Sequence, residues 1–124
     1  MPILNVQILQ GQTPDRKRAF LKAATDAVVS SLPAPLSSVR VFLAELAPEN
    51  VLVSGQADID AVLIQVALIS GRTEEAKSAL IAALNEATVQ TLGVDGAQIR
   101  VILFDVPNTD MGMANGLSAK SQGR

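Results

Sequence analysis

The sequence predicts an α/β (α+β) protein in which two tandem β-α-β units form a four-stranded mixed sheet with two helices on one face. Three observations lead to this prediction. The chain repeats itself internally, each copy alternates strand-like and helix-like segments, and hydrophobic residues make up 48% of the composition. Only 2% of residues are aromatic, so aliphatic side chains must fill the core.

The internal repeat aligns residues 4–46 with residues 64–106 without a gap. Identical pairs are spread over its length: Val6/Val66, Gly11/Gly71, Thr13/Thr73, Lys17/Lys77, Ala27/Ala87, Leu32/Leu92, Arg40/Arg100 and Val41/Val101. A repeat of this length indicates a duplicated supersecondary unit. We therefore divide the single domain of residues 1–124 into a first unit at 2–50, a linker at 51–60, a second unit at 61–116 and a tail at 117–124.

Four apolar segments rich in β-branched residues predict the strands. They are residues 3–9, 38–46, 62–69 and 98–106. A right-handed crossover makes the two strands of each unit parallel and puts both helices on one face of the sheet. Apolar side chains on both faces of the predicted strands indicate that other copies of the chain cover the opposite face. Gly-rich turn signals over 107–116 predict a short hairpin, and residues 117–124 have the composition of a polar tail.

Two segments with apolar residues at helical spacing predict the helices. Thr13 and Thr73 are the expected N-caps, and Pro14 occupies the first helical position of the first helix. Each helix is expected to end near Leu32 or Leu92, because a proline and a glycine follow. The apolar faces of both helices are interpreted as packing surfaces.

Composition excludes several classes of function. The net charge is −2 with no basic stripe, which argues against nucleic-acid binding. The absence of Cys and His removes disulfides, thiol nucleophiles, catalytic histidine and nearly every transition-metal site. The apolar stretches are too short for a membrane span, and no signal-peptide pattern opens the chain. We expect a soluble cytoplasmic protein with no nucleic-acid or membrane partner.

The first residues carry the most specific chemical signal. Proline follows the initiator methionine, which is normally removed when the second residue is small. Removal of Met1 would leave Pro2 with a free secondary amine, which can act as a general base or as an imine-forming nucleophile. Most Met-Pro starts carry no function. Here, however, Pro2 opens a strand-like run, and the repeat has Val62 at the same position.

These features resemble the 4-oxalocrotonate tautomerase family of the tautomerase superfamily. The resemblance rests on Pro2 followed by a strand, a glycine and a capped helix, and on residues 34–41 (APLSSVRV) at the start of the second strand. It covers residues 2–116. It implies a tautomerase-like fold in a fused, two-unit member, an expected homotrimer, and a cofactor-independent isomerase that acts on a small carboxylate.

In that family the N-terminal proline is the catalytic base, and arginines bind the substrate carboxylates and polarise its carbonyl. The proline falls on Pro2 in the first unit and on Val62 in the second. The arginine after the first strand falls on Gln12 in the first unit and on Arg72 in the second. The resemblance therefore assigns catalysis to Pro2 and Arg72, which would meet across a pseudo-two-fold axis and make one competent pocket per chain.

The family's second arginine falls on both Arg40 and Arg100, and in the oligomer it comes from a neighbouring chain. We favour Arg100 as the substrate-binding copy because Arg72 also belongs to the second unit, and the other copy could instead tie subunits together. The family's apolar wall, a phenylalanine, falls on Met111, or on Val51 in the first unit. Methionine can still exclude water from the pocket.

The implied reaction is enol–keto proton transfer on a 2-hydroxydienoate or 2-keto acid, with no cofactor or metal. Two other functions stay open. One is dehalogenation or decarboxylation within the superfamily, although the chain lacks the His or Tyr that dehalogenases add. The other is a catalytically silent structural or binding protein, because the Pro2 nitrogen is an amide wherever Met1 is retained.

Overall fold

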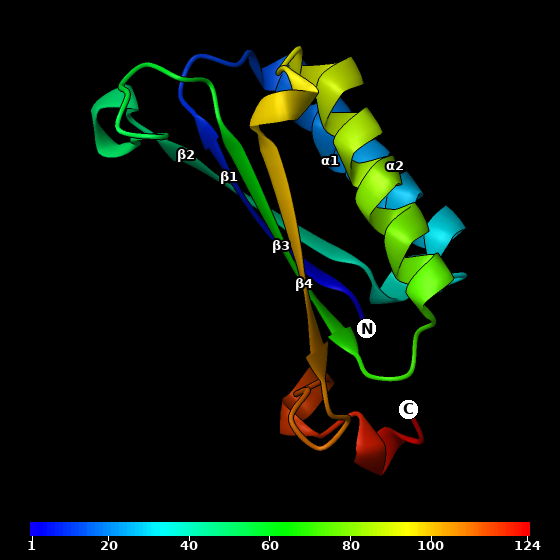
Figure 1. Cartoon of the computed structure of the whole chain (residues 1–124). Helices are drawn as coiled ribbons and strands as arrows, with labels where there is room; N and C mark the ends of the chain where they lie inside the picture. Colours follow the sequence, from blue (N-terminus) through cyan, green and yellow to red (C-terminus); the bar gives the residue numbers. More distant parts are fainter.

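The computed structural model describes residues 1–124 as one sheet with a layer of two helices on one of its faces (Figure 1). The elements are β1 (Ile3–Leu9), α1 (Pro14–Ser31), β2 (Arg40–Leu46), β3 (Val62–Ile69), α2 (Glu74–Leu92) and β4 (Ile99–Val106). The strand order is β2-β1-β3-β4. β1 pairs with β2 and β3 with β4 in parallel, whereas β1 and β3 are antiparallel. The predicted fold class is confirmed.

Both helices begin where the sequence predicts. The Thr13 hydroxyl accepts the backbone N–H of Arg16 at 3.2 Å, and the Thr73 hydroxyl accepts that of Ala76 at 3.1 Å. A side-chain oxygen at the N-cap satisfies one of the amides that the first turn leaves unpaired. α2 ends at Gly93, whose φ of 67° is in the left-handed region that glycine tolerates. The second strands start later than predicted, because 3-10 turns occupy residues 36–38 and 96–98.

The core lies between the sheet and the helices. Alternate residues of β1 and β3 are buried against the helix layer, and the largest fully buried side chains include Leu4, Ile8, Ile64, Leu68, Phe20, Leu80 and Leu84. Burial of one such side chain contributes about 1.5–3 kcal/mol. The period of two along the strands and the helical spacing along α1 and α2 therefore fix which sheet face meets the helices.

The opposite face of the sheet is uncovered in the single chain. It presents Phe42 on β2 at 55% exposure, and Ile102 and Phe104 on β4 at 43% and 46%. In the strand register these residues share a face with Asn5 and Gln65, which is the face turned away from the helices. Large apolar side chains on an exposed sheet face favour an intermolecular contact.

The two units are equivalent in detail as well as in outline. Lys17 of α1 pairs with Glu45 of β2 at 2.8 Å, and Lys77 of α2 pairs with Asp105 of β4 at 2.6 Å. Partly exposed pairs of this kind contribute about 0–1 kcal/mol each. The pairs show that the two units are equivalent, because each pair joins the helix of its unit to the second strand of that unit.

The segment after β4 folds back at the end of the sheet where β1 starts, so both chain termini lie at one end of the molecule (Figure 1). Gly112, in the region where a hairpin is predicted, forms an antiparallel bridge with Ser118, which lies beyond that region in the predicted tail. The last residues carry one fully buried side chain, Ala119, whose carbonyl accepts the Arg124 N–H at 2.9 Å. No helix combines the length and apolar character needed to cross a bilayer.

Candidate active site

The antiparallel pairing of β1 and β3 brings the start of the first unit to the end of the third strand. Ile3 is opposite Ala67, so Pro2 lies beside the segment through which the chain leaves β3. Gly71 in that segment has a φ of 121°, which a side chain would oppose. The backbone turns there and carries Arg72 back toward the first unit, where its Nη1 donates to the Leu32 carbonyl at the end of α1.

A cavity of about 380 Å³ surrounds the amino terminus. It is lined by Met1, Pro35, Ile69, Ser70, Gly71, Arg72 and Arg124. Pro2 is buried, and its carbonyl accepts the Arg40 N–H at 3.1 Å. The lining thus holds two guanidinium groups and no carboxylate side chain, which makes the cavity attractive to an anion.

The surroundings of the amino terminus favour a neutral amine. Burial lowers the pKa of the Met1 amino group below its ordinary value of 8.0, and the positive charges of Arg72 and Arg124 lower it further. Desolvation and nearby cations both disfavour the ammonium form. An amine in this position is therefore neutral in a larger fraction of molecules near neutral pH than an exposed amino terminus.

Arg124 is a residue of the cavity that sequence reasoning missed. Its main-chain oxygen accepts from the Asn108 side chain at 2.9 Å and its N–H donates to the Ala119 carbonyl, so Arg124 is held in place. The sequence offered only a lone arginine in a polar stretch. Nothing in its spacing indicated that the segment folds back to the amino terminus.

The two strand arginines lie at opposite ends of the sheet. Arg40 is opposite Ile3 at the start of β2, next to Pro2, whereas Arg100 is opposite Leu63 at the start of β4. Both are exposed. Within one chain the structure therefore brings Arg40 to the Pro2 end and keeps Arg100 away from it, so Arg100 can reach a Pro2 pocket only from another copy.

Met111 lies in the segment after β4 and is only 5% exposed. Its carbonyl accepts the Ala119 N–H at 2.8 Å. It is not among the residues that line the cavity at the amino terminus of the single chain. This segment lies at the same end of the molecule as the amino terminus.

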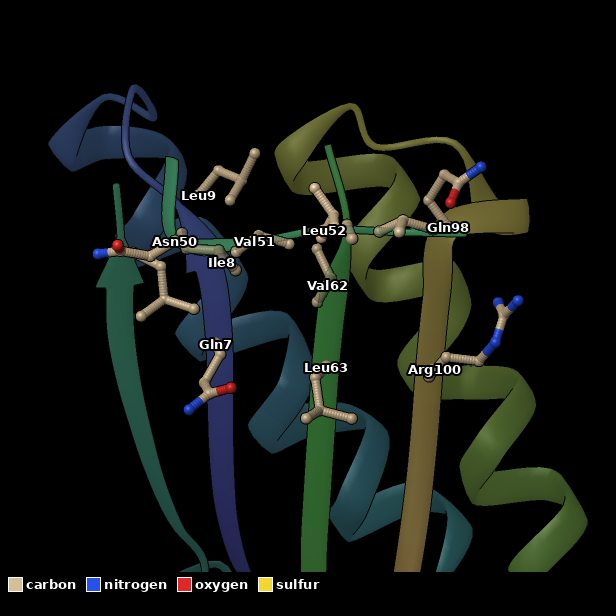
Figure 2. A pocket seen from close by; sticks show the side chains of 13 residues that line it. Gln7, Ile8, Leu9, Asn50, Val51, Leu52, Val62, Leu63, Gln98 and Arg100 are labelled. Atoms are coloured by element: carbon tan, nitrogen blue, oxygen red, sulfur yellow. The ribbon is translucent and has the colours of Figure 1, made fainter. Parts of the chain in front are cut away.

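A second cavity, of about 370 Å³, lies at the other end of the sheet (Figure 2). It contains Val62, Arg100 and Val51, which the repeat aligns with Pro2, Arg40 and Met111. The Val62 nitrogen is an internal amide and cannot act as a base. The structure gathers no group of three or more His, Cys, Asp or Glu side chains that could hold a metal ion at either end.

Arg72 and Gln12 hold equivalent structural positions. Arg72 bonds the Leu32 carbonyl at the end of α1, and the Gln12 Nε2 donates to the Leu92 carbonyl at the end of α2 at 2.9 Å. The Gln12 Oε1 is buried without a partner. Each side chain thus satisfies a carbonyl at the end of the other unit's helix, but only Arg72 also supplies a charge.

The profile of the family described as "Tautomerase enzyme" matches residues 2–57 and 63–120 of this chain, once in each unit. The chain belongs to the tautomerase family. Membership makes it an isomerase, as the resemblance in sequence implies.

Curated relatives match one unit each. A probable tautomerase of Ralstonia nicotianae is 54% identical over 52 residues, which are 42% of this chain and 74% of the relative. The 2-hydroxymuconate tautomerase of Comamonas testosteroni is 42% identical over 60 residues, which are 48% of this chain and 94% of the relative. These single-unit relatives are therefore about half as long as this tautomerase.

Solved structures match the whole chain. A fused 4-OT solved as a symmetric trimer has 55% identity and a TM-score of 0.96, with 98% of this chain and 99% of that chain covered. A fused 4-OT solved as an asymmetric trimer has 36% identity and a TM-score of 0.93 over the same shares. The fused, two-unit organisation of this tautomerase is thus shared by proteins that form trimers.

The equivalent contacts of Arg72 and Gln12 predict a matched effect on stability. Arg72→Ala removes a hydrogen bond and a positive charge at the carboxyl end of α1, and should lower the free energy of unfolding by about 1–2 kcal/mol. Gln12→Ala removes one hydrogen bond but also relieves the unpaired Oε1, and should cost about 0.5–1 kcal/mol. Guanidinium titration at equal protein concentration measures both. A larger loss for Gln12→Ala than for Arg72→Ala would contradict this assignment.

Proposed function

We propose that this tautomerase catalyses enol–keto proton transfer on a small 2-hydroxydienoate or 2-keto acid, with Pro2 as the general base once Met1 has been removed. The observation that supports it most strongly is the cavity that joins the amino terminus to Arg72. Relatives of single-unit length are 2-hydroxymuconate tautomerases, which supports the substrate class.

In the proposed reaction the proton that the base removes from the substrate is returned to the substrate. The neutral Pro2 nitrogen removes the proton of the 2-hydroxyl group, the C–O bond becomes a carbonyl, and the conjugated double bond shifts. The prolyl ammonium then returns the same proton to a carbon of the former diene. General-base catalysis of this kind works best when the pKa of the base is near the working pH. Burial and the two arginines favour such a value, as they do for the Met1 amino group.

Arginine side chains supply the binding energy and the charge stabilisation in this proposal. Arg72 polarises the oxygen on which negative charge develops, since its guanidinium is held at the cavity by the Leu32 carbonyl. A strand arginine binds the substrate carboxylate in two-pronged geometry. Arg40 lies at the Pro2 end of the same chain, and Arg100 would come from a neighbouring copy. Met111 is proposed to shield the pocket from water.

A homotrimer is the proposed working form. The exposed apolar face of the sheet, with Phe42, Ile102 and Phe104, requires a cover, and fused relatives form trimers. A trimer of two-unit chains would bury the three sheets against one another. A cytoplasmic location remains a prediction from the sequence.

Blocking the amine is the first test of the proposed base. Pro2→Ala replaces the secondary ring amine with a primary amine. Extension of the chain by one glycine before Pro2 converts the Pro2 nitrogen into an amide. The extended protein should lose about 10²-fold or more in kcat/KM for 2-hydroxymuconate, because a general base contributes about 10²–10⁴-fold. Pro2→Ala should fall between the extended and the normal protein.

Intact-mass spectrometry of the assayed protein is the necessary control, because it shows whether Met1 has been removed. Full activity of the glycine-extended protein would disprove the role of Pro2. Complete retention of Met1 in active protein would disprove it as well. A processed protein with no activity on any enol acid would favour a silent binding function.

The second test uses the pH dependence set by Arg124. A lowered pKa keeps the amine neutral to lower pH, so the acidic limb of kcat/KM should lie below the ordinary range of an α-amine, roughly 7.7–8.0. Arg124→Ala removes one of the charges that lower this pKa, and should move the acidic limb to higher pH. Lys120→Ala, an exposed cation of the same segment outside the cavity, should leave it in place. Equal profiles for both variants would exclude Arg124 from the pocket.

A further inference from the structure

The Met1–Pro2 peptide bond shows what the fold accepts on the Pro2 nitrogen. Met1 is half-buried and lines the amino-terminal cavity, whereas Pro2 is buried. The atom bonded to the Pro2 nitrogen is a planar carbonyl carbon, which also carries the Met1 carbonyl oxygen and the Met1 Cα. A carboxylate bonded to that nitrogen, which is a carbamate, is also planar and puts an oxygen at each of those two places. The fold therefore has room for a carbamate on Pro2 once Met1 has been removed.

The charges of the cavity suit such a group. Arg72 and Arg124 are its only charged side chains, so it contains two cations and no anion. Neither takes part in any of the ion pairs of the structure. The Arg72 side chain bonds only the neutral Leu32 carbonyl, and Arg124 is held through its main-chain oxygen by the Asn108 side chain. Guanidinium groups in this state can bind a carboxylate through stronger, charge-assisted hydrogen bonds.

We propose that the Pro2 amine of the processed protein is a site of reversible modification by carbon dioxide. The lone pair of the neutral Pro2 nitrogen attacks the carbon of CO2 and forms an N–C bond. The electrons of one C–O π bond move to oxygen, and the proton of the nitrogen is released to water. The product is a carbamate with one negative charge, whose oxygens Arg72 and Arg124 bind. The inference rests on the same free amine as the proposed function but needs no enol substrate.

Only a neutral amine reacts with CO2, and this distinguishes Pro2 from the lysines of the chain. Burial lowers the pKa of an amino group in this cavity, and the charges of Arg72 and Arg124 lower it further. Lys22 is the opposite case, because the hydrogen bond and charge of Asp26 raise its pKa above the ordinary value of 10.5. Such an amine stays protonated near neutral pH, so the modification is expected at Pro2 alone.

The modification would switch off the proposed base. In a carbamate the nitrogen lone pair is delocalised into the carboxylate group, so Pro2 can no longer accept a proton. The carbamate also occupies the cavity in which the substrate would bind. Because carbamates lose CO2 again, the effect is reversible. Dissolved CO2 is therefore inferred to inhibit the proposed reaction by modifying the free enzyme.

Chemical trapping tests the site directly. Processed protein, with removal of Met1 checked by intact mass, is equilibrated with ¹³C-labelled bicarbonate near neutral pH and treated with triethyloxonium, which converts carbamates into stable ethyl carbamates. Peptide mass spectrometry should find the labelled group on Pro2 and not on Lys22 or Lys120. Arg72→Ala and Arg124→Ala should each lower the yield about threefold or more, since each removes a carboxylate partner and a charge that favours the neutral amine. Lys120→Ala, which removes a cation outside the cavity, should leave the yield unchanged.

Three results would overturn the proposal: no label on Pro2, equal labelling of the lysines, or the same yield in both arginine variants as in Lys120→Ala. Turnover of 2-hydroxymuconate at constant pH and ionic strength supplies the functional readout. Replacing chloride by bicarbonate should lower kcat/KM at least twofold, and degassing should restore it. Inhibition without label on Pro2 would mean simple anion binding and would refute the modification.

The trapping result is separate from the proposed catalysis. Labelled Pro2 in a protein that turns over no enol acid would uphold the CO2 site and refute the proposed function. Full turnover by a protein that takes up no label would do the reverse.

Discussion

The antiparallel pairing of β1 with β3 is the constraint on which the rest of the molecule depends. The register is symmetric about Asn5 and Gln65, since Ile3 is opposite Ala67 and Gln7 is opposite Leu63. The start of each unit therefore lies at the end of the other unit's first strand. A parallel pairing would put Pro2 beside Val62 and Arg72 beside Gln12, and neither end would combine an amine with a guanidinium.

Comparison of Arg72 with Gln12, which the symmetry makes equivalent, distinguishes what the fold requires at this position from what the proposed chemistry requires. Arg72 and Gln12 both satisfy a carbonyl at the end of the opposite helix, so each unit keeps a long hydrogen-bond donor at this position. Only Arg72 adds a charge, and it does so at the end that also holds the amino terminus. The duplicated scaffold is thus preserved in both halves, whereas charge and amine are concentrated in one. The other half keeps a cavity of similar size with different chemistry.

Much of this arrangement can be predicted from the sequence because its signals are local. The threonine caps, the glycines after the strands and the alternation of apolar residues each act over a few positions. The repeat then shows that both units fold alike. Placing the amino terminus near Arg72 needed one further step, the pseudo-two-fold relation of the two units, which the family resemblance implied. The place of Arg124 could not be predicted, because it depends on tertiary contacts such as the hydrogen bond from the Asn108 side chain to the Arg124 main-chain oxygen. The separation of Arg40 from Arg100 in space follows from the register, which the repeat alone does not fix.

Subunit mixing tests most directly whether amine and guanidinium come from one chain. Chains with Pro2→Ala and chains with Arg72→Ala would be unfolded together, refolded and assayed against each variant refolded alone. Because Met1 and Arg72 of one chain line the same cavity, mixed trimers should show no activity above the average of the separate variants. Recovery of activity tenfold or more above that average would mean that the two groups meet between chains, and would contradict the arrangement described above.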